Sequence, residues 1–182
     1  MDIWAIASEK RFITLEGDEI TAMLNLRTAM ANDTPLILSL VRELAQYERE
    51  PDAILATEDD LRRDGFSANP KFHAVIAEWN TEPAGMALFF NHYSTWEGRP
   101  GIFVEDLIVR PQFRGKGIGK ALMKYLARRA LDEGCYGMRW EVHSWNKDGV
   151  AFYRGLGGKF RENGRVMQLK GAELKRLAEL AQ

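Results

Sequence analysis

The sequence has few of the two residue types that most often cross-link or metallate small folds, cysteine and histidine. Cys135 is the one cysteine among 182 residues, so no disulfide can form within the chain, and a reducing cytoplasm fits this usage. His73, His92 and His143 are far apart and lack the short spacing of metal ligands. We therefore expect a cytoplasmic protein with no disulfide and no metal site.

Long apolar runs and an excess of one charge are also missing. No run reaches the roughly 20 residues that span a bilayer, and Asp2 stands where a signal peptide carries basic residues. The formal charge of −1 gives no overall field that would favour nucleic acid or an acidic membrane surface. Charge is nevertheless uneven, since residues 42–64 hold eight acids and four bases, whereas residues 110–131 hold seven bases and no acid. Separate faces could therefore serve a cation and an anion.

The chain does have 46% hydrophobic residues, enough for a core in one domain, and its most patterned stretch begins at Ile102. The β-branched and aromatic run from Ile102 to Val109 predicts a strand, which Pro111 closes. From Ile118, apolar residues recur every four positions with lysines on the opposite face, which predicts an amphipathic helix starting near Gly117.

Gly115, Gly117 and Gly119 lie between this strand and this helix. They remove side chains that would block close backbone approach, beside a helix end whose first N–H groups attract anions. The spacing fits neither Gly-x-Gly-x-x-Gly nor a turn that ends in Gly-Lys-Ser/Thr. An ordinary strand-to-helix turn is the alternative.

Two motifs in this order resemble those of the GCN5-related N-acetyltransferases (GNAT). Arg114-x-x-Gly117-x-Gly119 after a strand resembles motif A, and Asn146 followed by Phe152-Tyr153-Arg154-Gly155 resembles motif B. The resemblance covers roughly residues 24–170 and implies the GNAT fold with acetyl-CoA as cosubstrate. The residues it implies for acetyl-CoA are Leu107, Ile108 and Val109 along the pantetheine arm, Arg114, Gly115, Lys116, Gly117, Ile118 and Gly119 at the pyrophosphate, and Asn146, Phe152 and Tyr153 from motif B.

Acetyl transfer to an amine needs a base for the amine and an acid for the departing thiolate. Glu105 is our candidate base, because a carboxylate inside an apolar strand is costly without a task; the alternative is a pair with an arginine or a backbone cap. Alternation sends Glu105 and Asp106 to opposite faces, unless a bulge, as in this family, changes that parity. By the resemblance Tyr153 is the acid, with a core aromatic as the alternative. By the same resemblance Asn146 bonds the pantetheine; it could also be a helix cap, and both can be true.

Further segments resemble the spermidine/spermine and thialysine acetyltransferase branch, among them residues 43–48, 60–66, 104–106 and 144–146. That resemblance implies a small amine as acceptor and a homodimer that pairs through the C-terminal strand region. One departure is Arg165 near the last strand, where polyamine-type members carry an aromatic; it would favour an amino-acid acceptor. The residues implied for the acceptor are the carboxylates Glu48, Glu105 and Asp106, with Tyr47, Trp96 and Trp145 as aromatic walls.

The remaining patterns predict strands at 24–29, 72–79, 84–90, 138–143 and 166–169, and helices from Pro35 to near Glu48, from Thr57 to just before Gly65 and from Glu173. Residues 91–101 are predicted to form a loop. We predict an α/β fold with a mixed, mostly antiparallel central sheet flanked by helices. Residues 1–22 are interpreted as an N-terminal extension of unknown role, and residues 23–182 as one GNAT domain.

These observations predict an N-acetyltransferase that moves acetyl from acetyl-CoA directly to a polyamine, diamine, thialysine or lysine-like amine. One alternative is a protein-lysine or N-terminal acetyltransferase, which would need an open groove for its acceptor. The other is a non-catalytic acetyl-CoA sensor, which could dispense with Glu105 and Tyr153. We expect neither nucleic acid nor membrane as a partner.

Overall fold

The computed structural model describes residues 23–162 and 164–179. The chain divides into two compact units, the first ending at Glu141 and the second beginning at Val142. Our interpretation of residues 1–22 lies outside the described residues. The first unit contains β1 (Leu24–Thr28), α1 (Thr34–Tyr47), α2 (Glu58–Gly65), β2 (His73–Trp79), β3 (Glu82–Ser94), β4 (Arg99–Val109), α3 (Ile118–Asp132) and β5 (Met138–Trp140), with 3₁₀ turns at Ala31–Asp33, Pro51–Ala53 and Pro111–Phe113. The second unit contains α4 (Lys147–Gly155) and α5 (Gly171–Glu179).

The strands of the first unit form one sheet in the order β1-β2-β3-β4-β5. The first three pairs are antiparallel, and β4 pairs with β5 in parallel. A parallel pair needs a long crossover, which α3 supplies. The predicted mixed, mostly antiparallel sheet is confirmed.

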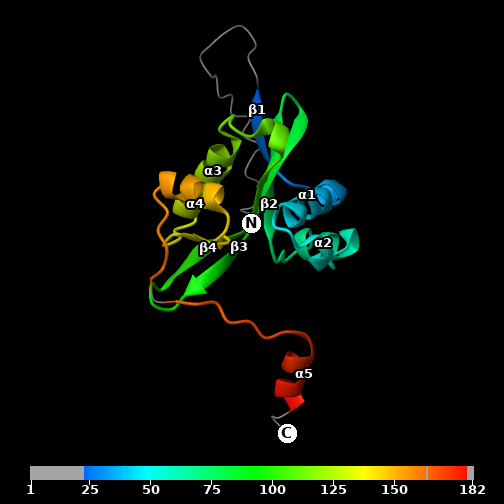
Figure 1. Cartoon of the computed structure of the whole chain (residues 1–182), viewed down its shortest axis with the longest axis vertical. Helices are drawn as coiled ribbons and strands as arrows, with labels where there is room; N and C mark the ends of the chain where they lie inside the picture. Colours follow the sequence, from blue (N-terminus) through cyan, green and yellow to red (C-terminus); the bar gives the residue numbers. More distant parts are fainter. Residues whose placement is uncertain (1–22, 163, 180–182) are drawn as a thin grey trace. The chain divides into compact units, whose positions relative to one another are not determined.

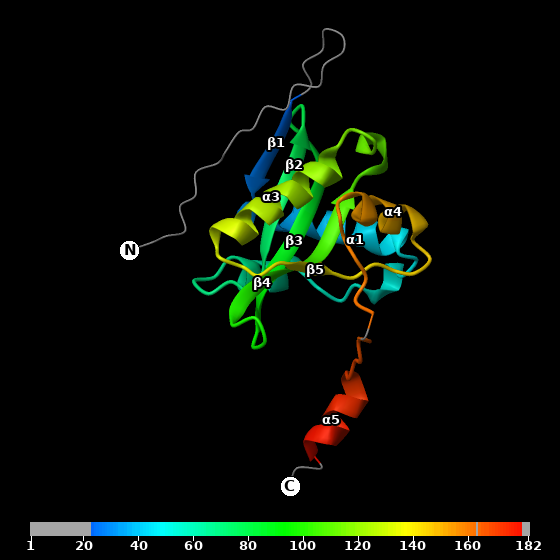
Figure 2. The same cartoon turned by 90° about the vertical axis from the view of Figure 1, so that its left-hand side faces the viewer.

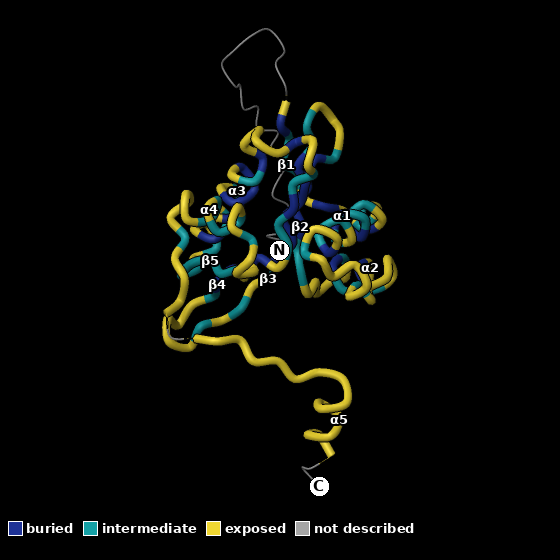
Figure 3. The backbone as a smooth tube through the Cα atoms, in the orientation of Figure 1, coloured by how far each residue is buried: buried dark blue, intermediate teal, exposed yellow. Residues whose placement is uncertain are grey.

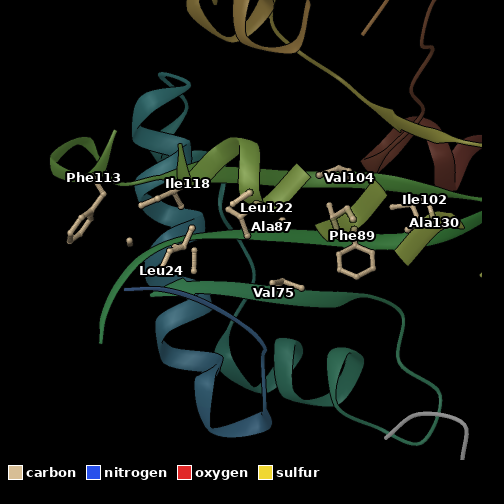
Figure 4. Close-up of a cluster of buried hydrophobic side chains, with 14 residues drawn as sticks. Leu24, Val75, Ala87, Phe89, Ile102, Val104, Phe113, Ile118, Leu122 and Ala130 are labelled. Carbon is tan, nitrogen blue, oxygen red and sulfur yellow. The ribbon is translucent and has the colours of Figure 1, made fainter. Parts of the chain in front are cut away.

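Helices cover both faces of this sheet: α3 lies on one face, and α1 and α2 lie on the other (Figures 1 and 2). Successive residues of β2 show the division, because Val75 belongs to the apolar cluster on the α3 side and Ile76 to the cluster on the α1 side. On the α3 side, Phe89 and Val104 from the sheet pack in one cluster with Leu122 (Figure 4). Because both faces are covered, the central strands are nearly continuous apolar runs.

Helix α2 starts where its sequence predicts. Thr57 Oγ1 accepts a hydrogen bond from Asp60 N at 3.2 Å, and Asp60 Oδ2 accepts one from Thr57 N at 3.0 Å. This reciprocal capping box satisfies two backbone donors at the helix start. The three acids of the first turn also complement the helix dipole.

The prediction of a loop over residues 91–101 is wrong for most of that range. Strands β3 and β4 continue as a hairpin, with Asn91 opposite Ile102 and Ser94 opposite Arg99. The residues between the paired strands are 95–98. Asparagine, proline and glycine have low strand propensity, but pairing along the neighbouring strand overrides it.

The second unit carries the helices that its sequence predicts, including α5, but not the predicted strand at 166–169. Residues 165–170 have no regular secondary structure, and Val166 and Met167 are 76% and 95% exposed. Figure 3 shows this stretch as exposed. A strand needs a neighbour for its backbone groups, and the described residues provide none here.

Candidate active site

Strand β4 carries a β-bulge at Glu105. In the β3–β4 ladder Leu88 lies opposite Asp106 and Phe89 lies opposite Val104, so Glu105 has no partner in the register. Val104 and Ile108 are four positions apart and would share one face of a regular strand. Val104 instead packs on the α3 side and Ile108 on the α1 side, which shows that the extra residue reverses the alternation. The parity change that we expected from a bulge is confirmed.

The bulge also decides which carboxylate is buried. Glu105 is exposed, whereas Asp106 is half-buried at a position opposite Leu88, which packs on the α1 side. Our expectation that Glu105 is enclosed in an apolar strand is therefore wrong. The extra residue turns the chain by one position, and Asp106 occupies the enclosed place instead.

Asp106 lies within electrostatic reach of the other two carboxylates implied for the acceptor, Glu105 and Glu48. Burial, then the charge of Glu105, then that of Glu48, raise the pKa of Asp106 to about 7. Partial desolvation of its carboxylate, then the charge of Glu141, raise the pKa of Glu105, although its side chain as a whole is exposed. A carboxyl that titrates near neutral pH can both accept a proton and attract a cation.

Strand β4 separates from β5 just where the bulge occurs. Their parallel pairing covers Ile102 to Val104 against Met138 to Trp140, and β5 ends there instead of continuing to His143 as predicted. Beyond the bulge, Leu107 to Val109 pair with β3 on one side only among the described residues. Their backbone on the other side is therefore not engaged in strand pairing, which an extended ligand could use.

The glycine-rich turn, residues 114–119, follows the 3₁₀ turn that Phe113 anchors in the core. Gly115 and Gly117 both have φ of 77°, which glycine adopts without strain, and Gly117 is the N-cap of α3. A Cβ on either glycine would meet no atom within 4 Å, so the space above the turn is open. An open turn at a helix N-terminus can bind an anion.

Both cations of the glycine-rich turn lie over aromatic rings. The Arg114 guanidinium is 4.9 Å from the ring centre of Tyr47, and Lys116 Nζ is 5.1 Å from that of Trp79. Arg114 Nε also donates a hydrogen bond to Val109 O at 3.1 Å. Tyr47, which we expected to line the acceptor site, thus contacts the turn.

Arg110, just before the 3₁₀ turn, has a different partner that the sequence alone did not reveal. Its guanidinium donates to both carboxylate oxygens of Glu43 on α1, with Nη2–Oε1 at 2.8 Å and Nε–Oε2 at 3.0 Å. These hydrogen bonds lower the pKa of Glu43. Glu43 precedes Tyr47 by one helical turn, and this i, i+4 spacing, which places both side chains on the same face of α1, was the one sequence signal that Glu43 lies near the turn. No sequence pattern marked Trp79, at the end of β2, as a contact of the turn.

The motif-B residues lie in the second unit. Asn146 caps α4, its Oδ1 accepting a hydrogen bond from Gly149 N at 2.9 Å, so the expected helix cap is present. Phe152 and Tyr153 are in edge-to-face contact with ring centres 5.1 Å apart. Trp145 stacks on His143 at 5.5 Å.

Trp96 lies near the tip of the β3–β4 hairpin and is 96% exposed. Glu105 is six residues beyond Arg99, the first residue of β4, a separation of roughly 20 Å along an extended strand. Within one protomer, Trp96 is therefore too far along β4 to contact an acceptor bound at Glu105 or Asp106.

The described part of the chain holds neither a cluster of metal ligands nor a membrane-spanning helix. No group of three or more histidines, cysteines or carboxylates is placed to hold a metal ion in residues 23–162 and 164–179. No helix in that part of the chain is long and apolar enough to cross a bilayer.

Comparison with known proteins gives consistent matches. The sequence model of the acetyltransferase (GNAT) family matches residues 36–157. Thialysine N-epsilon-acetyltransferase of Bos taurus is 40% identical over 146 residues, covering 76% of this chain and 85% of that protein. Spermidine/spermine N(1)-acetyltransferase-like protein 1 of Homo sapiens is 36% identical over 139 residues, which is 72% of this chain and 20% of that protein.

Among solved structures, an integron cassette protein from the mobile metagenome of V. cholerae superimposes with a TM-score of 0.73 at 24% identity. The match covers 86% of this chain and 98% of that one. At this identity the likeness concerns the fold.

Proposed function

The chain belongs to the acetyltransferase (GNAT) family, and we propose that it moves the acetyl group of acetyl-CoA directly to the amine of a small cationic acceptor. It is an N-acetyltransferase that acts on amines, like the thialysine N-epsilon-acetyltransferases that are about 40% identical to it. The observation that carries the finer proposal is the half-buried Asp106 beside Glu105 and Glu48, a few residues before the glycine-rich turn. Strand β4 thus carries acidic residues that suit a cation, and the glycine-rich turn after it suits an anion.

Acetyl-CoA would lie along the part of β4 that has left β5. Backbone groups of Leu107, Ile108 and Val109 suit the pantetheine arm, and the open turn at Gly115 and Gly117 suits the pyrophosphate. By the resemblance to motif B, Asn146, Phe152 and Tyr153 are also assigned to acetyl-CoA.

Starting from an ammonium group, the reaction removes two protons from the nitrogen and supplies one to the thiolate. An alkylamine is almost wholly protonated at pH 7, so a carboxylate, Glu105 directly or through water, takes a proton before the nitrogen attacks. The nitrogen forms a bond to the acetyl carbon and the bond from that carbon to sulfur breaks. The nitrogen then releases its second proton to water, and Tyr153 gives its proton to the departing thiolate. A backbone N–H at the bulge would stabilise the oxyanion between these steps.

The acceptor would be held by charge. Asp106 and Glu48 would pair with its ammonium groups, and Trp145 offers an aromatic face. The thialysine relatives favour a lysine-like amine, and an arginine at position 165 would suit an acceptor with a carboxylate.

The direct test is a panel of diamines, polyamines, lysine, ornithine and thialysine, with acetyl-CoA and detection of the released thiol. We expect turnover with at least one of these and a product heavier by one acetyl group. Thiol release with a lysine peptide but with none of the small amines would favour a protein-lysine acetyltransferase. Binding of acetyl-CoA without any turnover would favour a sensor.

We further propose a cytoplasmic homodimer. The exposed apolar residues of the second unit, Val166 and Met167 among them, are side chains that a second copy could cover. Light scattering should give twice the monomer mass of 20.7 kDa. A single 20.7 kDa species at assay concentration would contradict the dimer and leave the activity proposal intact.

A further inference from the structure

Three basic residues flank or occupy the glycine-rich turn, and they differ in the kind of partner that each one contacts. Arg110 is 19% exposed and has a two-pronged carboxylate partner in Glu43. Arg114 and Lys116 are exposed and lie over rings. Neither of them has a carboxylate within salt-bridge distance in the part of the chain that the structure describes.

The kind of partner determines what a cation can still do. A carboxylate neutralises a guanidinium and occupies its N–H donors, as Glu43 does with Arg110. An aromatic face attracts the cation through its quadrupole but leaves the charge and the donors in place. A cation held over a ring is therefore positioned and still available to an incoming anion.

The contacts of Arg114 show how much of it is left available. Its Nε is used by Val109 O, and its plane lies over Tyr47. Neither contact consumes the two Nη groups, which together carry four N–H donors in the fork that suits phosphate. Gly115 and Gly117, on either side of Lys116, leave open space where a Cβ would stand.

We propose that Tyr47 and Trp79 are positioning residues for the pyrophosphate of acetyl-CoA, acting through Arg114 and Lys116. Each ring is the last residue of its element, Tyr47 of α1 and Trp79 of β2, and each holds one cation of the turn in place before the coenzyme arrives. Ordering these long side chains in advance reduces the entropy that binding must supply. The inference rests on the proposed placement of acetyl-CoA at the turn, and it reassigns Tyr47 from the acceptor to the coenzyme.

The test compares two acetyl donors, acetyl-CoA and S-acetylpantetheine, which lacks the pyrophosphate and the nucleotide. For Tyr47→Leu we expect a KM for acetyl-CoA that is higher by about 2- to 5-fold, the worth of one exposed cation–π contact. The KM for the amine and kcat/KM with S-acetylpantetheine should stay unchanged. Tyr47→Phe keeps the ring and is the matched control, which should behave as the parent protein.

A double-mutant cycle shows whether Tyr47 acts through Arg114. Arg114→Gln alone should raise the KM for acetyl-CoA, and adding Tyr47→Leu should raise it little further, because the ring then has no cation to hold. Trp79→Leu and Lys116→Gln make the second cycle. Tyr47 is 36% exposed at a helix end, so its replacement leaves the core intact even if Trp79→Leu does not fold.

The outcomes separate the inference from its premise. If Arg114→Gln raises the KM for acetyl-CoA but Tyr47→Leu does not, the positioning role fails and the coenzyme placement stands. A rise in the KM for the amine, additive losses in the cycle, or equal losses with both donors would also overturn the role of Tyr47. If Arg114→Gln changes nothing, the coenzyme does not use this turn and both proposals fall.

Discussion

Replacing Asp106 with asparagine should stabilise the protein at pH 8, and about two to three times less at pH 5. The folded environment raises the pKa of Asp106 from 3.8 to about 7, so near pH 5 this carboxyl is neutral in the folded chain and charged in the unfolded chain. The unfolding free energy therefore falls as the pH rises from about 4 to about 7, and the penalty is complete above that range. A shift of about three pH units corresponds to at most about 4 kcal/mol.

We expect Asp106→Asn to recover about 1 to 3 kcal/mol of that penalty at pH 8, because partial solvent access screens the charge. For a chain of this size the gain corresponds to a Tm higher by roughly 3–10 °C. At pH 5 the carboxyl is neutral in the folded chain but largely charged in the unfolded chain, so only about a third of the penalty is present and the rise in Tm should be correspondingly smaller. The same substitution should raise the KM for the cationic acceptor at pH 8, since the charge it removes is the one that pairs with the amine.

Thermal unfolding of both proteins at pH 5 and pH 8 is the measurement, with urea unfolding for the free energies. Asp52→Asn is the matched control, because Asp52 is an exposed carboxylate in a 3₁₀ turn and its loss should change stability by less than about 0.5 kcal/mol at either pH. Equal effects of Asp106→Asn at the two pH values, or a loss of stability at pH 8, would refute the inference that the folded chain destabilises the charged form of Asp106.

Three further substitutions test the chemistry and the coenzyme turn. Tyr153→Phe should lower kcat by roughly 10²–10⁴-fold, leave the Kd of acetyl-CoA nearly unchanged and remove the high-pH limb of the rate profile; a normal kcat would exclude Tyr153 as the acid. Glu105→Gln should suppress the rate and remove the acidic limb, with partial recovery as rising pH deprotonates the acceptor; without such recovery Glu105 is not the base. Gly117→Val should raise the Kd of acetyl-CoA in calorimetry, because a β-branched residue is strained at φ of 77° and fills the open space. Gly98→Val makes the same change at φ of 63° in the hairpin tip and should leave that Kd unchanged; equal effects of the two would contradict the assignment of the turn.

The helices and the central strands followed from local patterns in the sequence. The spacing of apolar and basic residues from Ile118 predicted α3, because one face of a helix repeats every 3.6 residues whatever packs against it. Thr57 and Asp60 predicted the start of α2 through bonds within one turn. The glycine-rich turn and the two family motifs were also readable, since they depend on residues close together in the chain.

Contacts between distant segments decided the rest. The bulge was expected only by resemblance, and because its register is set by β3 rather than by β4 alone, the pairing decided that Asp106 and not Glu105 is the enclosed carboxylate. The long hairpin formed against the propensity of its residues because each strand supplies the other's hydrogen-bond partners. Trp79 and Tyr47 meet the turn only after the sheet and α1 have brought together residues that lie 37 and 67 positions from their cations. Sequence by itself thus determined the local elements and the kind of chemistry, and tertiary pairing decided which side chains that chemistry can use.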